Sequence, residues 1–479
     1  MLFPTATFAV FFLVVMPLAA WLKAPSPGWK RFVLAASYVF YAWWDWRFVF
    51  LLGGSTVVNW MLGQAIARAG ASAGRWWLGL AVAFNLAVLG FFKYYGFFVA
   101  SADAALRPWG LASGLPYLDI VLPVGISFYT FQGISYVVDV YRRQVPAATL
   151  LDFAIYPAFF PHLVAGPIVR AAEFLPQLRA PDPLRRRDVS RAGWLIAQGA
   201  FKKVVVSTFL AGAIVDPVFA VPADHSGLEI ALAIYGYAVQ IYADFSGYTD
   251  MAIGIALLMG IRFPQNFDRP YAAESIADFW RRWHMTLSRW LRDYLYIPLG
   301  GSRHGAARTY RNLVLTMTLG GLWHGAAATF VAWGVFHGLG LAVERWWRGR
   351  GRDTDGGPTL ARRSAGARSA VGRGAARIAT FHFVCLGWVL FRAETFDGAV
   401  ALLQGLARPG PAPLATAAVA AAIGASLAVQ QLPPGWSARL EARFAHLPLA
   451  FQGAALGLFF AFTAALGPEG VAPFIYFQF

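Results

Sequence analysis

Charged residues are scarce in this sequence. They make up 13% of its 479 residues, whereas soluble domains carry about 25%. The hydrophobic share is 58%, above the roughly 45–50% of soluble domains. A soluble chain of this length needs a charged surface that this composition cannot supply. The scarcity excludes a disordered protein, a nucleic-acid-binding domain and an ordinary soluble enzyme, and it leaves a polytopic membrane protein.

Other missing features narrow the class further. The single cysteine, Cys385, excludes an intramolecular disulfide and a thiolate metal cluster. No P-loop, GxSxG, HExxH or zinc-ligand spacing occurs, so the motifs of soluble hydrolases are absent. We therefore expect no metal and no permanently bound cofactor. No internal repeat is present, which argues against a transporter built from two similar halves.

Apolar runs dominate what is present. A membrane-spanning helix needs about 20 apolar residues, and the runs predict an all-α fold with about 11–12 membrane segments. The stretch 153–169 is apolar but rich in proline and glycine, which is typical of a re-entrant segment. The predicted spans are 2–22, 31–46, 48–66, 76–98, 119–141, 193–215, 228–260, a broken pair across 312–343, 378–394, 412–431 and 449–467.

The basic residues fall mostly between these runs. Forty Lys and Arg against 24 Asp and Glu give a formal charge of +16, which indicates cytoplasmic loops facing anionic lipid rather than nucleic acid. Basic and acidic loops alternate, and the alternation places both termini outside. Lys202 and Lys203 fit this pattern poorly, because they fall within a predicted span. They mark its inner end or a polar lining.

We expect one integral-membrane domain with four parts. Residues 1–150 hold the N-terminal spans, and 151–345 form the catalytic core. Residues 346–377 are rich in arginine and glycine and are predicted to be a cytoplasmic linker. Residues 378–479 hold the last spans and an aromatic tail.

Residues 278–297 combine apolar and basic side chains at helical spacing. This pattern predicts one amphipathic helix lying in the cytoplasmic interface. His284 falls on its apolar stripe, where an anchoring helix does not require a histidine, so it is a candidate functional residue. The alternative is a hydrogen-bonded structural histidine. Candidate groups for an anionic substrate, beside or opposite that stripe, are Trp283, Arg281, Arg282, Arg289 and Arg292.

A second histidine, His324, lies in the run LGGLWHG. Twelve residues of helix from Asn312 reach about 18 Å, near the middle of the bilayer. Gly320, Gly321 and Gly325 are predicted to break the helix there and to let another group approach its backbone.

A desolvated imidazole at that depth is expected to be neutral and able to act as a general base; the alternative is a satisfied interhelical histidine. Trp323, beside His324, is a candidate substrate contact. His337, thirteen residues beyond His324, is interpreted as structural.

Two acidic residues and a tyrosine complete the candidates. Asp244 and Asp250 lie in a predicted span, where buried carboxylates need partners. They line a substrate cavity or support a helix contact. Tyr476, in the C-terminal run PFIYFQF, presents a hydroxyl nucleophile on the outer side; an aromatic belt anchor is the alternative.

These motifs resemble a known family. The run RPYAAESIADFWRRWHMTLSRWLRDYLYIPLGGSR, followed by GGLWHG and WGVFHG, is similar to membrane-bound O-acyltransferases. DFSGYTDMAIG and FFPHLVAGPIVR resemble its bacterial alginate O-acetylase branch. The resemblance covers most of the chain and implies a ring of tilted helices around a central funnel. It also implies that His324 is essential for transfer and that His284 lines the cytoplasmic side of a tunnel.

The resemblance further implies a reaction. Acetyl-CoA, as donor substrate, enters from the cytoplasm of a bacterial cell with its phosphates near the arginines. The acetyl group passes through the inner membrane to a polysaccharide outside, helped by a periplasmic partner of the SGNH-hydrolase type. Tyr476 matches a tyrosine proposed to carry the acyl group in similar C-terminal motifs. Two alternatives remain: D-alanyl transfer from a carrier protein to teichoic acid, and a lipid or glycan transporter.

Overall fold

Helices form every regular element that the structure describes. The computed structural model describes residues 1, 3–350, 369–467 and 475, and no strand occurs among them. The predicted all-α fold is confirmed. Contacts divide the chain into two compact units: residues 1–200, 248–264 and 447–456 form the first, and residues 201–247, 265–446 and 457–479 form the second.

The first unit contains the N-terminal helices. Its elements are α1 (Ala6–Leu22), α2 (Pro27–Ala42), α3 (Arg47–Arg68), α4 (Ala71–Leu89), α5 (Tyr95–Leu106), α6 (Ile126–Tyr141), α7 (Leu150–Ala158), α8 (Phe160–Leu163), α9 (Ala171–Arg179) and α10 (Arg186–Ala200). The predicted span 119–141 is therefore too long, because its helix begins only at Ile126, after Gly125 adopts a φ of 77°. The predicted re-entrant stretch 153–169 contains the end of the short helix α7 and all of α8.

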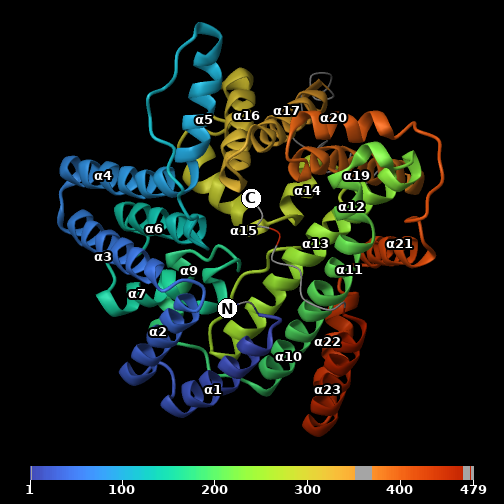
Figure 1. Cartoon of the computed structure of the whole chain (residues 1–479). Coiled ribbons are helices and arrows are strands. Elements are labelled where there is room, and N and C mark those ends of the chain that lie inside the picture. The colour runs from blue at the N-terminus through green and yellow to red at the C-terminus, as the bar shows by residue number, and fades with distance from the viewer. Residues whose placement is uncertain (2, 351–368, 468–474, 476–479) are drawn as a thin grey trace. The chain divides into compact units, whose positions relative to one another are not determined.

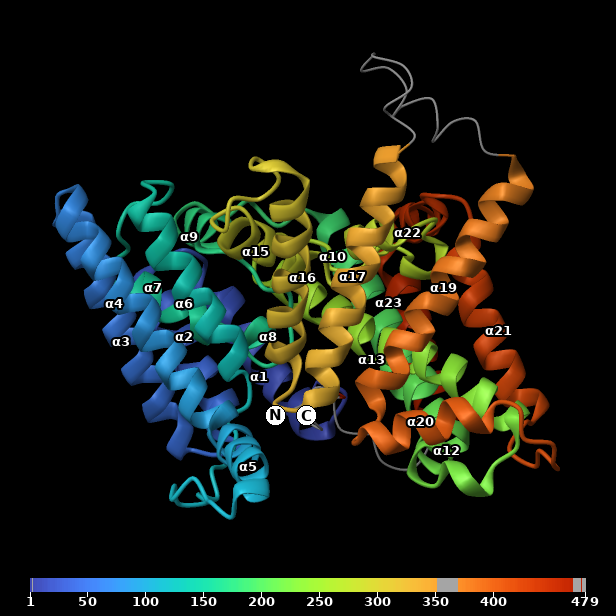
Figure 2. The ribbon, with the colours of Figure 1, turned by 90° about the horizontal axis from the view of Figure 1, so that it is seen from above.

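Helices α3, α4 and α6 lie side by side in this unit (Figure 2). Asn59 and Asn85, both buried, exchange amide hydrogen bonds of 3.2 and 2.7 Å between α3 and α4. On α6, a side chain at Gly133 would come within 2.8 Å of Asn85. A glycine there lets three apolar helices meet around one satisfied polar pair, as expected for packing in lipid.

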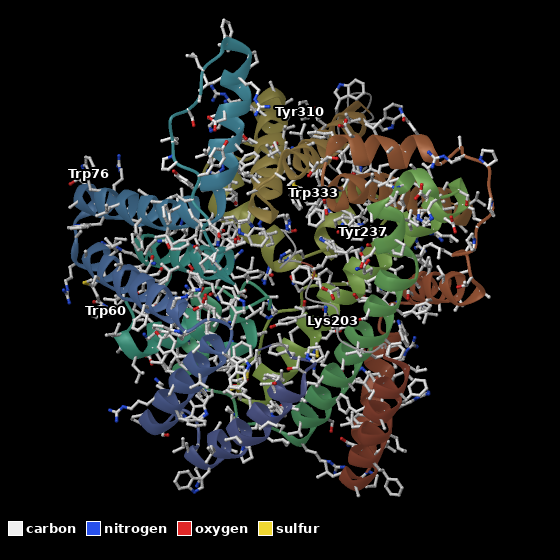
Figure 3. The ribbon with its side chains drawn as sticks, in the orientation of Figure 1. Trp60, Trp76, Lys203, Tyr237, Tyr310 and Trp333 are labelled. Atoms are coloured by element: carbon white, nitrogen blue, oxygen red, sulfur yellow. The ribbon has the colours of Figure 1, made fainter. Side chains whose placement is uncertain are left out.

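Long apolar helices mark the chain as a membrane protein. Five helices or continuous helical runs are long and apolar enough to span a bilayer, or six if one bent pair is a single span. They are Arg47–Arg68, Ala71–Trp109, Arg186–Ala220, Ala370–Arg392, Leu449–Leu466 and the bent pair Ala417–Gln431 with Trp436–His446. These helices carry exposed apolar side chains, such as Trp76 near the N-terminal end of α4, which is 82% exposed (Figure 3). The count of 11–12 segments and the central funnel stay predictions.

The second unit holds the first part of the long helix α13, the short helices before it and most of the helices after it. Its elements are α11 (Thr208–Leu210), α12 (Asp216–Ala220), the first part of α13 (Gly227–Leu258), α14 (Ile276–Arg282), α15 (Met285–Leu291), α16 (Gly305–His324), α17 (Ala328–Arg350), α19 (Ala370–Arg392), α20 (Phe396–Gly405), α21 (Ala417–Gln431), α22 (Trp436–His446) and the second part of α23 (Leu449–Leu466). Most of the predicted linker, residues 351–368, lies outside the described residues.

Helices α16 and α17 form a tight antiparallel hairpin (Figure 2). A side chain at Gly321 would overlap the Phe330 carbonyl oxygen, and one at Gly338 would come within 2.7 Å of the Val314 Cα. The predicted close approach to the glycines is confirmed. The predicted break occurs at Gly325, the residue after the end of α16, and α17 begins at Ala328. Gly320 and Gly321 do not take part in the break, because α16 continues through both to His324. These glycines let the backbones of α16 and α17 approach each other closely, and the close packing stabilises the hairpin.

Candidate functional site

The predicted amphipathic helix over 278–297 is wrong, because it is interrupted at His284. α14 ends at Arg282 and α15 begins at Met285, with His284 between them at φ 42° and ψ 51°. The cause is pairing with another segment: Asp268 N donates to Arg282 O, and Met285 N donates to Asn266 O, each at 2.9 Å. These tertiary hydrogen bonds override the helical period, which is why the sequence pattern fails here.

His284 is fully buried in this break and contacts Phe245 of α13. The Phe245 ring meets the imidazole edge-on, with centroids 4.7 Å apart. A non-glycine residue in the left-handed region is strained and persists only where its surroundings hold it, which is common at functional sites. The expectation that an amphipathic anchor helix presents His284 is replaced by a strained junction that presents it.

His324 ends α16 and lies beside His284. Their ring centroids are 6.4 Å apart, although the two residues are 40 positions apart in the chain. Trp323, Trp333 and Phe391 surround the His324 ring at centroid distances of 4.9, 5.2 and 5.3 Å. His324 is 4% exposed. The structure therefore brings the two predicted histidines together among aromatic side chains, and Trp323 contacts both rings. The other predicted tryptophan, Trp283, is buried and stacks on Phe279.

His337 lies on α17, with its ring centroid 4.9 Å from that of Trp333. Trp333, labelled in Figure 3, also contacts His324 on α16. His337 Nδ1 accepts a 3.3 Å hydrogen bond from Trp280 Nε1, and His337 is fully buried. This environment is consistent with a structural residue. Sequence reasoning missed Trp333; its helical spacing from His337 is the signal that points to it.

Asp244 on α13 forms a buried ion pair with Lys203. Lys203 lies in the π-helical segment Phe201–Ser207, and its side chain is 3% exposed. Ser207 Oγ also donates to Asp244, at 3.2 Å, and the backbone N–H of Ile475 donates to its other oxygen at 2.9 Å. Lys203 is thus a buried ion-pair partner, and Asp244 joins three segments of the chain.

Asp250 and three of the predicted arginines contact other polar side chains. Asp250 belongs to the first unit, where Gln198 Nε2 donates to it at 3.1 Å. The predicted phosphate-binding arginines have local carboxylate neighbours: Arg281 and Arg282 lie 3.8 and 3.0 Å from Asp278, and Arg292 lies 2.6 Å from Asp293. Tyr476 lies outside the described residues. Across the described chain, no cluster of three His, Cys, Asp or Glu could hold a metal.

Comparison with known proteins decides the family. The sequence model of the membrane-bound O-acyltransferase family matches residues 141–355, which include both histidines. A probable alginate O-acetylase of Azotobacter vinelandii is 43% identical over 397 residues, covering 81% of this chain and 75% of the relative. This chain belongs to the membrane-bound O-acyltransferase family.

Other members of the family show the range of its chemistry. A peptidoglycan O-acetyltransferase of Helicobacter pylori is 36% identical over 85% of this chain and 78% of its own length. A teichoic acid D-alanyltransferase of Bacillus subtilis is 27% identical over 62% and 78%. This O-acyltransferase is thus an enzyme and a multi-pass membrane protein, which removes the transporter alternative.

Proposed function

We propose that this O-acyltransferase passes an acetyl group from cytoplasmic acetyl-CoA through the membrane, for O-acetylation of a polysaccharide outside. The juxtaposition of His284 and His324 carries the proposal, because it sets two buried imidazoles 6.4 Å apart among aromatic side chains. The O-acetylases among the relatives, at 43% and 36% identity, favour acetyl as the acyl group. The probable alginate O-acetylase, at 43% identity, favours an alginate-like acceptor.

His324 acts as the general base in this proposal. It takes the proton from an acceptor hydroxyl, and the hydroxyl oxygen attacks the thioester carbonyl. The carbon–sulfur bond breaks, CoA leaves as thiolate and then takes up a proton, and an oxygen ester remains. A positioned base contributes typically 10²–10⁴-fold. The buried aromatic walls exclude water, which protects the thioester from hydrolysis.

The acetyl-CoA phosphates bind near the arginines that follow Asp278. Arg281 has a 67% exposed side chain, so its pair with Asp278 is weak and can be exchanged for a phosphate. The other candidate arginines belong to the same region: Arg282 ends α14, Arg289 lies in α15, and Arg292 directly follows α15. Arginine suits this task because its planar fork binds phosphate oxygens in pairs.

The first acceptor hydroxyl is that of Tyr476. What supports this assignment is its neighbour: Ile475 is 2% exposed and donates its backbone N–H to Asp244, and the next residue on α13, Phe245, contacts His284. From the tyrosyl ester, a periplasmic protein of the SGNH-hydrolase type transfers the acetyl group to the glycan. In this arrangement the protein lies in the bacterial inner membrane with both termini outside.

Replacing His324 by alanine tests the function in cells. We expect the acetyl esters on the secreted polysaccharide to disappear while the protein is expressed normally. His382→Ala is the matched control, because His382 lies exposed on α19 and bonds to Tyr235. Normal acetylation in the His324 variant would remove the assignment.

D-alanyl transfer is the second candidate, favoured by the 27% identical teichoic acid D-alanyltransferase. The purified protein distinguishes the two. Release of CoA from acetyl-CoA supports acetyl transfer, whereas turnover with a D-alanyl carrier protein and none with acetyl-CoA supports the alternative.

A further inference from the structure

Asn266 holds His284 through its side-chain amide. Asn266 Oδ1 lies 3.1 Å from the backbone N of Thr286, 2.8 Å from its Oγ1 and 3.2 Å from His284 Nδ1. The backbone N–H of Thr286 can only donate, so the amide atom facing it is the oxygen. The orientation of the Asn266 side chain is therefore fixed by its partners.

This orientation decides which nitrogen of His284 carries the proton. An amide oxygen can only accept, so His284 Nδ1 must be the donor, and the neutral ring is the Nδ1–H tautomer. Nε2 then carries a lone pair. Within the described chain this atom has no hydrogen-bond partner, and neither does Nδ2 of Asn266. Both residues are at most 1% exposed.

One buried acceptor and one buried donor thus belong to the same pair of side chains. Buried polar groups without partners are costly and call for a specific explanation. A substrate that brings a donor to Nε2 satisfies the imidazole, and an acceptor on the same substrate satisfies the Asn266 amide. An amide group, as in the pantetheine arm of CoA, carries both.

We propose that Asn266 is a positioning residue, which fixes His284 as the Nδ1–H tautomer so that its Nε2 accepts a hydrogen bond from an amide N–H of the donor substrate. This inference rests on the proposed function. It gives the two histidines different tasks: His324 removes a proton from the acceptor hydroxyl, and His284 orients the acyl donor. The left-handed backbone at His284 is what the Asn266 contacts maintain.

The surroundings of His284 keep its imidazole neutral. Burial lowers its pKa to about 3, in a junction outside the candidate spans. The groups that face the ring are Phe245 from α13, and Trp323 and the titratable His324 from α16. An added carboxylate at position 266 would favour the imidazolium and raise that pKa. Protonation removes the lone pair, so activity would then be lost at a higher pH than in the wild type.

Nitrogen-15 NMR of the full-length protein in nanodiscs tests the tautomer directly. With ¹⁵N-labelled histidine, the His284 signals are assigned by their loss in His284→Gln. We expect a protonated Nδ1 and an unprotonated Nε2 in the wild type, and loss of this preference in Asn266→Ala. A protonated Nε2 in the wild type would overturn the inference. This readout does not depend on any transfer activity.

Kinetics with acetyl-CoA test the role. We expect Asn266→Ala to lower kcat/KM about tenfold or more, because a buried hydrogen bond that positions His284 is lost. Asn266→Asp keeps the accepting oxygen and should restore activity at high pH, with its acidic limb displaced upward. Asn312→Ala is the control, because Asn312 is an equally buried amide that donates to Leu299 and Gly301. It should leave the pH profile unchanged.

The outcomes separate the two proposals. An unaltered kcat/KM and pH profile in both Asn266 variants, with an active wild type, would overturn this inference alone. A wild type that shows the expected tautomer but never releases CoA would refute the proposed function and leave the positioning of His284 intact.

Discussion

Asp244 is ion-paired with Lys203 inside the second unit, and both side chains are at most 3% exposed. Two buried charges persist only when they neutralise each other and their remaining hydrogen-bonding positions are filled. Ser207 and the backbone N–H of Ile475 fill those of the carboxylate. The Asp244 side chain thus joins the buried ion pair to the C-terminal segment around Ile475.

Removing one partner of this pair should destabilise the protein strongly. We expect Lys203→Met to lower stability by about 3–5 kcal/mol, because it leaves Asp244 as an uncompensated buried charge. The double variant Lys203→Met with Asp244→Asn should recover most of the loss. The half-lives of thermal inactivation in detergent rank the stability of the wild type, the single variant and the double variant. Equal lifetimes for the single and double variants would contradict the account.

Two adjacent glycines on α16 should respond differently to alanine. At Gly321 the new methyl group would overlap the Phe330 carbonyl, which is backbone and cannot move aside. We expect a loss of about 1–3 kcal/mol and displaced packing around His324. At Gly320 the nearest atom is Leu291 Cδ1 at 3.2 Å, which can rotate away.

Gly320→Ala is therefore the matched control, with a cost below about 1 kcal/mol, since alanine also favours the helix. Unfolding temperatures in detergent and CoA release compare the two variants. A Gly321→Ala protein as stable and active as Gly320→Ala would show that the α16–α17 contact does not support the site.

The arginines of α14 and α15 should bind the phosphates of the donor and should not contact its thioester. We expect Arg281→Gln to raise KM for acetyl-CoA severalfold, more at low than at high ionic strength, because the contact is exposed and screened by salt. With acetyl-pantetheine, which lacks the nucleotide phosphates, KM should not change. An equal increase in KM for both donors would contradict a phosphate contact and would indicate that the substitution disturbs folding.

Tyr476 should be required for its hydroxyl. We expect Tyr476→Phe to stop acetylation of the polysaccharide, because phenylalanine keeps the aromatic ring and removes the nucleophile. Tyr310→Phe on α16 serves as the control for loss of a phenol elsewhere. Mass spectrometry of trapped protein should find an acetyl ester on the C-terminal peptide. Unchanged acetylation would favour an interfacial anchor.

The sequence predicts much of this architecture because apolar runs and close-packing glycines leave local signals. α3, α13 and α19 all follow from hydropathy, and the approach to Gly321 follows from small-residue spacing. The break at His284 does not follow, because 278–297 has a sound helical period. Only the distant segment around Asn266 interrupts it.

Contacts between distant segments also explain why the sequence does not predict the role of the buried charged residues. Lys203 looks misplaced in a span until its partner Asp244, 41 residues later, is known. The contact of Ile475 with Asp244 joins positions 231 apart. Pairings at such separations leave no periodic signal, whereas the two histidines are recognisable because polar groups in apolar runs are costly.

Acetyl transfer by the purified protein tests the central claim most directly. Proteoliposomes containing the wild type, His324→Ala or His382→Ala receive acetyl-CoA with a labelled acetyl group, and the label on the protein and the release of CoA thiol are followed. We predict that the wild type and His382→Ala release CoA and acquire the label, and that His324→Ala does neither. Equal labelling and CoA release by His324→Ala would contradict the account.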